Sequence, residues 1–156
     1  DIGFCVHGLV HDPDDRDRIW RQEHTGMFRS TDGGESWHAI EEGLPSTFGF
    51  PIVRDHSSRA LFSFPLDKDE YRLPAEGRFR VYRSRNDGDS WEPLEKGLPT
   101  NFYAGVLRGA MATDHDGGVY VGSTAGTVHI TTDGGESWQN LEATLPRILS
   151  VDVYPE

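Results

Sequence analysis

The sequence predicts an all-β fold built from three four-stranded antiparallel units followed by one closing strand. A turn pattern that ends in Trp occurs three times, and short apolar stretches of strand length lie between the turns. The composition agrees, because 18 Gly and 9 Pro among 156 residues are typical of a turn-rich β protein. Trp37, Trp91 and Trp138 lie 54 and 47 residues apart, which fits a repeat of about 40–50 residues.

The repeated turn has the pattern Ser/Thr-x-Asp/Asn-x-Gly-x-Ser-Trp. An Asp or Asn side chain can accept hydrogen bonds from backbone N–H groups just ahead of it. The Gly can adopt positive φ without steric cost, and the Trp that leaves the turn can bury a large ring. We therefore assign a structural role to the pattern residues, which are Ser30, Asp32, Gly34 and Trp37, then Ser84, Asn86, Gly88 and Trp91, and last Thr131, Asp133, Gly135 and Trp138.

The elements follow from alternation between turn signals. The first unit, residues 3–45, is expected to hold strands near 4–10, 18–23, 26–30 and 36–40, with a polar turn at 11–17. The second unit, 46–99, is expected to hold strands near 49–54, 59–64, 78–84 and 90–94, with a charged insertion at 65–77. The third unit, 100–146, is expected to hold strands near 106–113, 118–122, 126–131 and 137–141, and a closing strand is expected at 147–154.

Composition also excludes some classes of function. The net charge is −11, which opposes binding to nucleic acid or to an anionic membrane. A single cysteine, Cys5, allows no internal disulfide, and no signal peptide or membrane-spanning apolar run is visible. These features leave the compartment open, with a slight preference for the cytoplasm. Because the chain begins at Asp1 without Met, we expect a processed form or a fragment.

The repeated turn resembles the Asp box, or BNR repeat, of sialidase-like β-propellers, where it joins the third and fourth strands of a blade. Flanking stretches resemble bacterial BNR-repeat proteins that are labelled exo-α-sialidase or glycosyl hydrolase by similarity; they are 5–7, 22–26, 80–84 and 145–151. The resemblance implies that residues 1–156 form one propeller half-domain, equivalent to the C-terminal half of such proteins. The expected partners are then the remaining blades of the ring or a second copy of the chain.

In such propellers the Asp boxes lie on the face opposite the ligand site. The resemblance thus directs attention to the loops between second and third strands, the inner strands and the linkers. Ligand-binding candidates there are His7, Gln22, His24, Arg72 and Arg108. Sialidases use three Arg on the substrate carboxylate, a Tyr nucleophile with a Glu partner, and an acidic Asp. The resemblance implies Arg54, Arg72 or Arg108 for the first set, and Tyr103, Glu70 and Asp69 as catalytic candidates, although the Phe-Arg-Ile-Pro stretch of that family is absent.

No cofactor and no metal site is expected from the sequence. His7 and His11 would lie about 13 Å apart on a strand, too far to share one ion. Asp12, Asp14, Asp15 and Asp17 could ligate Ca²⁺ but are expected to form a solvated turn. Cys5 could serve as a nucleophile beside His7, although a buried inner-strand cysteine is the commoner case. Two functions stay open: a non-catalytic scaffold or module that binds a glycan or protein, and a sialidase-like glycoside hydrolase completed by missing blades or a second copy.

Overall fold

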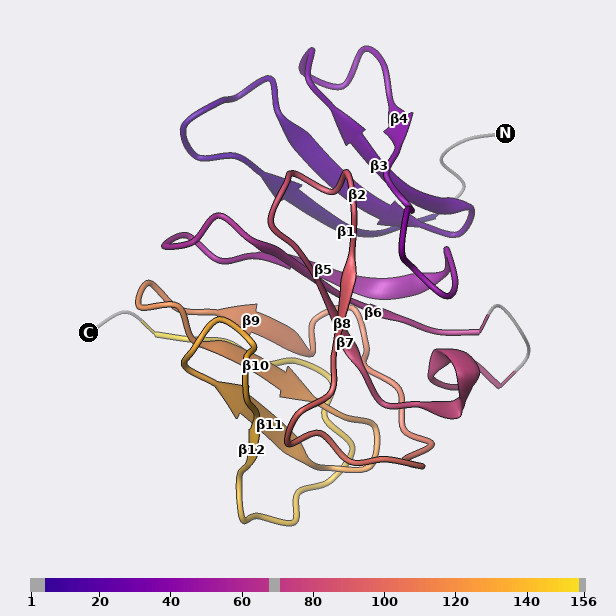
Figure 1. Cartoon of the computed structure of the whole chain (residues 1–156), viewed down its shortest axis with the longest axis vertical. Helices are drawn as coiled ribbons and strands as arrows, with labels where there is room; N and C mark the ends of the chain where they lie inside the picture. Colours follow the sequence, from indigo (N-terminus) through magenta and orange to yellow (C-terminus); the bar gives the residue numbers. More distant parts are fainter. Residues whose placement is uncertain (1–4, 68–70, 155–156) are drawn as a thin grey trace.

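The computed structural model describes residues 5–67 and 71–154 and shows three antiparallel sheets of four strands each. Within each sheet the strands follow one another in chain order, as in the blades of a propeller (Figure 1). Blade one contains β1 (Val6–His11), β2 (Ile19–Glu23), β3 (Gly26–Ser30) and β4 (His38–Ala39). Blade two contains β5 (Gly49–Arg54), β6 (Leu61–Pro65), β7 (Val81–Ser84) and β8 (Glu92–Leu94). Blade three contains β9 (Met111–Thr113), β10 (Val119–Gly122), β11 (Val128–Thr131) and β12 (Gln139–Asn140).

The three blades are stacked side by side through their first strands, with β1 against β5 and β5 against β9 (Figure 1). The turns from first to second strands lie together at one end of the stack, toward the left of the figure. The turn between β2 and β3 and the described parts of the β6–β7 connection, 66–67 and 71–80, lie at the opposite end. The all-β propeller architecture expected from the sequence is therefore confirmed.

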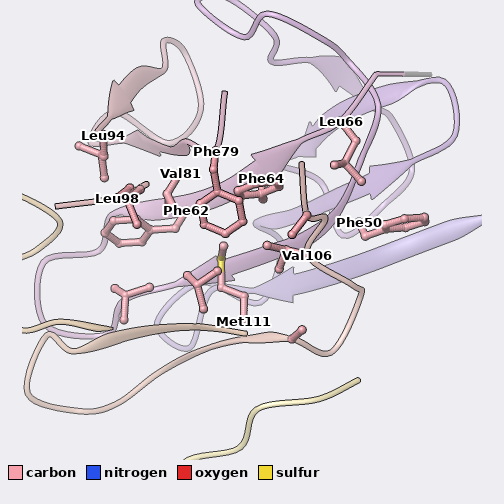
Figure 2. Close-up of a cluster of buried hydrophobic side chains, with 14 of the residues drawn as sticks. Phe50, Phe62, Phe64, Leu66, Phe79, Val81, Leu94, Leu98, Val106 and Met111 are labelled. Atoms are coloured by element: carbon pink, nitrogen blue, oxygen red, sulfur yellow. The ribbon is translucent and has the colours of Figure 1, made fainter. Parts of the chain in front are cut away.

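The hydrophobic core lies between blades rather than inside any single one. Trp20, Ile40, Ile52, Leu61 and Trp91 belong to a buried cluster between blades one and two. A larger cluster joins blades two and three, where the Met111 side chain points toward the Phe79 ring and Phe50 lies at one end (Figure 2). A four-stranded blade has two apolar faces, and stacking is what removes both from water.

All three repeated turns share one hydrogen-bond scheme. In blade three, the Thr131 hydroxyl donates to Asp133 Oδ1 at 2.6 Å and accepts from the Gly135 N–H at 3.0 Å. Ser137 donates its N–H to Asp133 Oδ1 and its hydroxyl to Oδ2, at 2.9 and 2.6 Å. Asn86 takes the place of the carboxylate in blade two, and its Nδ2 donates to Ser90 Oγ instead. The glycine has φ of +97°, +97° and +95° at positions 34, 88 and 135, as the turn requires.

The Trp of each repeat is placed against the preceding blade where there is one. Trp91 is 5% exposed and donates from Nε1 to the Ile40 carbonyl of blade one at 2.8 Å. Trp138 is 4% exposed, and its backbone N–H donates to the Lys96 carbonyl of blade two. Trp37, in the first described blade, is only partly buried and lies under the Arg21 guanidinium, 3.9 Å from the ring centroid. The Trp of the second and third repeats thus connects its blade to the preceding one.

A second set of aspartates closes the turns between first and second strands. Asp12, Asp55 and Asp114 each accept a hydrogen bond from the backbone N–H two residues ahead. The Asp12 carboxylate also accepts hydrogen bonds from both terminal nitrogens of Arg54, at 3.2 and 3.3 Å, and this buried ion pair joins blades one and two. This geometry supports the expected turn at 11–17, with the carboxylates used for folding.

Several boundaries differ from the sequence prediction. The fourth strands are short, and the strand expected at 106–113 is regular only over β9, because residues 104–110 form hydrogen-bonded turns and links to the β10–β11 connection. The charged insertion holds one short 3₁₀ turn, Ala75–Gly77. Residues 147–154 form no regular strand: Ser150 makes a single parallel bridge to Gly109, and Val151 donates to the Gly109 carbonyl. This segment therefore lies beside the residues that lead into β9.

Candidate functional site

A cleft of about 380 Å³ opens at the end of the stack opposite the Asp boxes. Its walls come from the start of β5, the β6–β7 connection, the linker before β9, the β10–β11 turn and the C-terminal segment. Eleven described residues line it: Phe50, Leu66, Tyr71, Arg72, Leu73, Tyr103, Gly105, Val106, Leu107, Thr124 and Arg147. This volume lies within the range of small-ligand sites.

Hydrogen bonds hold the walls of the cleft in position. The β6–β7 connection is folded back by the Asp67 N–H, which donates to the Leu73 carbonyl, and by a bridge between Leu66 and Pro74. The linker before β9 is tied to the β10–β11 turn, since Gly105 donates to Thr124 Oγ1 at 3.0 Å and accepts from the Thr124 N–H at 2.9 Å. The cleft is thus a built feature of blades two and three.

The cleft combines an apolar floor with an aromatic and cationic rim. Phe50 and Val106 are buried beneath it, whereas Tyr71 is 74% exposed and Tyr103 is 64% exposed. The Arg72 guanidinium lies 5.3 Å from the Phe50 ring centroid, and Arg147 is exposed and makes no ion pair with a described residue. None of the lining residues that the structure describes is acidic. Among its described residues, the cleft thus offers aromatic, apolar and cationic side chains to a ligand.

A second group of side chains adjoins the cleft through Phe50. We call Cys5, His7 and His24 the histidine cluster; their ligand-type atoms lie within 4.8 Å of one another. His7 Nδ1 is 2.6 Å from the Gly49 carbonyl oxygen, and His7 Nε2 is 3.0 Å from His24 Nδ1. Burial lowers the pKa of His7 below its usual value, and the nearby Arg108 guanidinium adds to this effect despite the opposing bond to Gly49.

The structure separates the residues that were expected to bind a ligand or to act in catalysis. Arg72 and Tyr103 both line the cleft, and Arg108 lies 5.1 Å from the Phe50 ring at its side. Gln22, in contrast, is buried and donates from Nε2 to the carbonyls of Glu23, Gly26 and Thr47, which is a structural role. Arg54 lies at the far end of β5 in its buried pair with Asp12, so it does not join Arg72 and Arg108. Asp69 and Glu70 lie outside the described residues.

Sequence reasoning missed part of the cleft. Phe50, Tyr71, Thr124 and Arg147 were not selected. Phe50 lies on the inner strand β5, whereas the other three lie in loops or linkers assigned to the ligand face. Tyr71 and Arg147 carried a signal, because exposed aromatic and cationic residues in loops are more often functional than those on strands. The sequence also did not pair Cys5 and His7 with His24, since that contact depends on how β1 and β2 are aligned.

The Asp boxes on the other face show the features of scaffold. The hydroxyl and backbone N–H donors of their own turns lower the pKa of Asp32 and of Asp133 to about 2. Arg83 links the second box to the third, because it pairs with Glu92 and with Glu136. The carboxylates of Asp32 and Asp133 accept hydrogen bonds from several donors in their own turns, which suits them to stabilising the turn rather than to proton transfer.

Over residues 5–67 and 71–154, the structure contains no helix that is both long and apolar enough to cross a membrane.

Comparison with known proteins agrees with this architecture. The family model described as BNR/Asp-box repeat matches residues 28–39 and 129–140, the boxes of blades one and three. A curated relative, the photosystem II assembly lipoprotein Ycf48 of Synechococcus sp. (strain CC9605), is 29% identical over 125 residues. The match covers 79% of this chain and 36% of the relative, so the chain spans about a third of that protein's length.

Solved structures show the same fold at low identity. An ancestral GH74 enzyme has a TM-score of 0.70 at 23% identity, covering 88% of this chain and 18% of its own. The GH74 xyloglucanase of Xanthomonas campestris has a TM-score of 0.66 at 21% identity, with coverage of 85% and 20%. A structure of Ycf48 bound to D1 peptide has a TM-score of 0.57 at 16% identity, with coverage of 90% and 42%. The chain is therefore a β-propeller segment that carries BNR/Asp-box repeats, similar over its length to parts of much longer propeller proteins.

Proposed function

We propose that this chain is a non-catalytic propeller module whose cleft binds a carboxylate-bearing peptide segment of a partner protein. The observation that carries the proposal is the cleft itself, in which exposed Tyr71 and Tyr103 flank an apolar floor with Arg72 and Arg147 at the rim. Aromatic and arginine side chains are the residue types enriched where proteins bind partners. A guanidinium offers paired N–H donors that match a carboxylate.

The charge distribution supports a local anion site on an acidic chain. The net charge is −11, yet the described cleft lining contains two arginines and no acid. The two arginines attract an anionic segment to the cleft, and the negative net charge of the chain opposes non-specific binding of such a segment elsewhere. The similarity to Ycf48, a protein solved in complex with a D1 peptide, supports a peptide as the ligand class.

The arrangement gives less support to a sialidase-like hydrolase. That activity would need three arginines on one carboxylate, and Arg54 is engaged with Asp12 at the opposite end of β5. Two carboxyl groups about 5–10 Å apart across a bound sugar, as most glycosidases need, are not found among the described residues of the cleft. We therefore keep hydrolysis as an outcome of the test rather than as the proposal.

The proposal also includes further blades around the same ring, from another part of the protein or from a second copy. In support, Trp37 is half covered where Trp91 and Trp138 are buried against a neighbour. Light scattering of the 156-residue chain distinguishes the two sources: a stable dimer supports a second copy, and a monomer at all concentrations supports blades from elsewhere.

Binding is tested by calorimetric titration with the peptide acetyl-Ala-Tyr-Ala, carrying either a free C-terminal carboxylate or a C-terminal amide. We expect the carboxylate form to bind more tightly, by about tenfold for one charge-assisted contact. Arg147→Gln should remove most of this preference, whereas Arg85→Gln on the Asp-box face should leave it unchanged. Equal affinity for acid and amide, or equal effects of the two variants, would refute the proposal. Release of sialic acid from a fluorogenic sialoside would refute the non-catalytic assignment.

A further inference from the structure

The histidine cluster has the arrangement of a metal site before the metal is bound. His7 Nδ1 lies 2.6 Å from the Gly49 carbonyl oxygen, and a carbonyl can only accept, so Nδ1 carries the proton. His7 Nε2 then presents its lone pair to His24, 3.0 Å away. Metal-binding histidines are commonly oriented in this way, with one ring nitrogen donating to a backbone carbonyl and the other directed at the ion.

Cys5 completes the set from the start of the described chain. It lies two residues before His7, so both side chains are on the same side of the extended backbone, and His24 reaches them from the β2–β3 turn. The three donor atoms come from two separate segments that the pairing of β1 with β2 brings together. His7 is 5% exposed, while Cys5 and His24 are partly exposed, which leaves a route for an ion.

We propose that Cys5, His7 and His24 form a three-ligand site for Zn²⁺ with an open fourth position. A tetrahedral Zn²⁺ with two imidazole ligands holds their nitrogens about 3.3 Å apart, so the ion can replace the proton that His24 shares with His7 with little movement. One thiolate and two imidazoles suit Zn²⁺ better than the oxygen-preferring Mg²⁺ or Ca²⁺. This inference is independent of peptide binding in the cleft.

The surroundings suit an open site rather than a closed structural one. Phe48 and Phe50 pack on the His7 ring, with centroids 5.4 and 4.8 Å away, and cover one side. Arg108 Nη2 lies 3.4 Å from Cys5 Sγ, where it can donate to a metal-bound thiolate. The Arg108 guanidinium also repels the positive charge of the ion. The expected fourth ligand is therefore hydroxide or another anion, which lowers that charge.

The geometry favours this assignment over a cysteine nucleophile. A cysteine nucleophile that is activated by general-base catalysis needs a base in hydrogen-bond reach. Both nitrogens of His7 are engaged, by Gly49 and by His24, and the sulfur contact recorded among the described residues is to Arg108. The cluster thus offers three ligand atoms within 4.8 Å of one another, and no hydrogen bond from the thiol to a base is found among the described residues.

The test uses the full chain, reduced and treated with a chelator that is then removed, and Co²⁺ as a spectroscopic substitute for Zn²⁺. We expect one Co²⁺ per chain, intense tetrahedral d–d bands and a thiolate-to-cobalt charge-transfer band, all displaced by Zn²⁺. Cys5→Ser should abolish the charge-transfer band, and His24→Ala should weaken binding about 100-fold. Both residues are partly exposed, so both variants should fold, and circular dichroism checks this.

The chain contains a matched control at the other end of the stack. His56 and His115 are exposed and lie close, with ring centroids 5.4 Å apart, so they could bind a metal adventitiously. The double variant His56→Ala with His115→Ala should leave Co²⁺ affinity and spectrum unchanged. Loss of binding in this control, absence of a charge-transfer band in the wild type, or two chains bridged by one ion through Cys5 would each overturn the assignment.

Discussion

The two buried tryptophans of the repeats differ in one contact, which makes them a matched pair. Trp91 and Trp138 are equally buried, at 5% and 4% exposure. Trp91 Nε1 donates to the Ile40 carbonyl across the blade interface, whereas Trp138 Nε1 has no hydrogen-bond partner among the described residues. Substitution by Phe removes the same volume from both sites, so the cavity terms largely cancel between the two variants.

We expect Trp91→Phe to destabilise the chain more than Trp138→Phe. The first substitution breaks a buried hydrogen bond and leaves a carbonyl without its partner, at a cost of about 1–3 kcal/mol. The second removes a buried donor that already lacks a partner, which offsets part of the cavity cost. The predicted difference in the free energy of unfolding is about 2 kcal/mol.

Urea unfolding followed by circular dichroism measures this difference without relying on tryptophan fluorescence. The slopes of the two transitions should agree, so that the shift in midpoint reports stability. Equal stabilities within about 0.5 kcal/mol, or a larger loss in Trp138→Phe, would show that the interblade hydrogen bond does not contribute as argued. Trp37→Phe, at the partly exposed position, should cost less than either.

Three further predictions concern the turns and use the same unfolding assay. Gly88→Ala should destabilise the chain more than Gly34→Ala, by about 1–3 kcal/mol. Both glycines have φ of +97°, but a Cβ at position 88 would lie 2.5 Å from the Ile40 side chain of blade one, whereas a Cβ at position 34 would lie 3.6 Å from its nearest neighbour, the Trp37 ring. The pKa of Asp133 is about 2 in the folded chain, below the ordinary 3.8, so the unfolded chain binds more protons and stability falls from about pH 4 to pH 2. Asp133→Asn should reduce this fall, as measured by the urea midpoints across that pH range. Asp12→Asn should lower the free energy of unfolding by about 3–5 kcal/mol, because it leaves the buried Arg54 guanidinium without its counter-ion. A loss below about 1 kcal/mol would contradict that role.

The repeated turn was predictable residue by residue because its contacts are local. The hydroxyl, the carboxylate or amide, the glycine and the serine of each box interact within five positions of one another, as at Thr131 and Asp133. Local hydrogen bonds depend on sequence spacing alone. The same logic located the turn at 11–17, which Asp12 closes, and the order of strands in each blade.

The candidate site was less predictable, because its members come from segments far apart in the chain. Arg54 and Arg72 look alike in the sequence, yet one is buried against Asp12 and the other lies beside Phe50 at the cleft. The difference arises because Arg54 ends β5, whereas Arg72 follows β6 on the opposite face. The sequence likewise did not predict that Gln22 donates to the carbonyls of the neighbouring turn and linker, because these contacts depend on how the segments pack.

The sequence by itself determined the fold class, the strand order and the local hydrogen-bond pattern of the Asp-box turns, since these follow from periodicity and from hydrogen bonds between near neighbours. Only the tertiary structure decided which side chains come together. Examples are the cleft lined by Tyr103 and Arg147, the proximity of Cys5 and His7 to His24, and the packing of Trp91 against blade one. The physical reason is that strand register and blade stacking set these contacts, and both depend on burying apolar surface across the whole assembly rather than on any single stretch of chain.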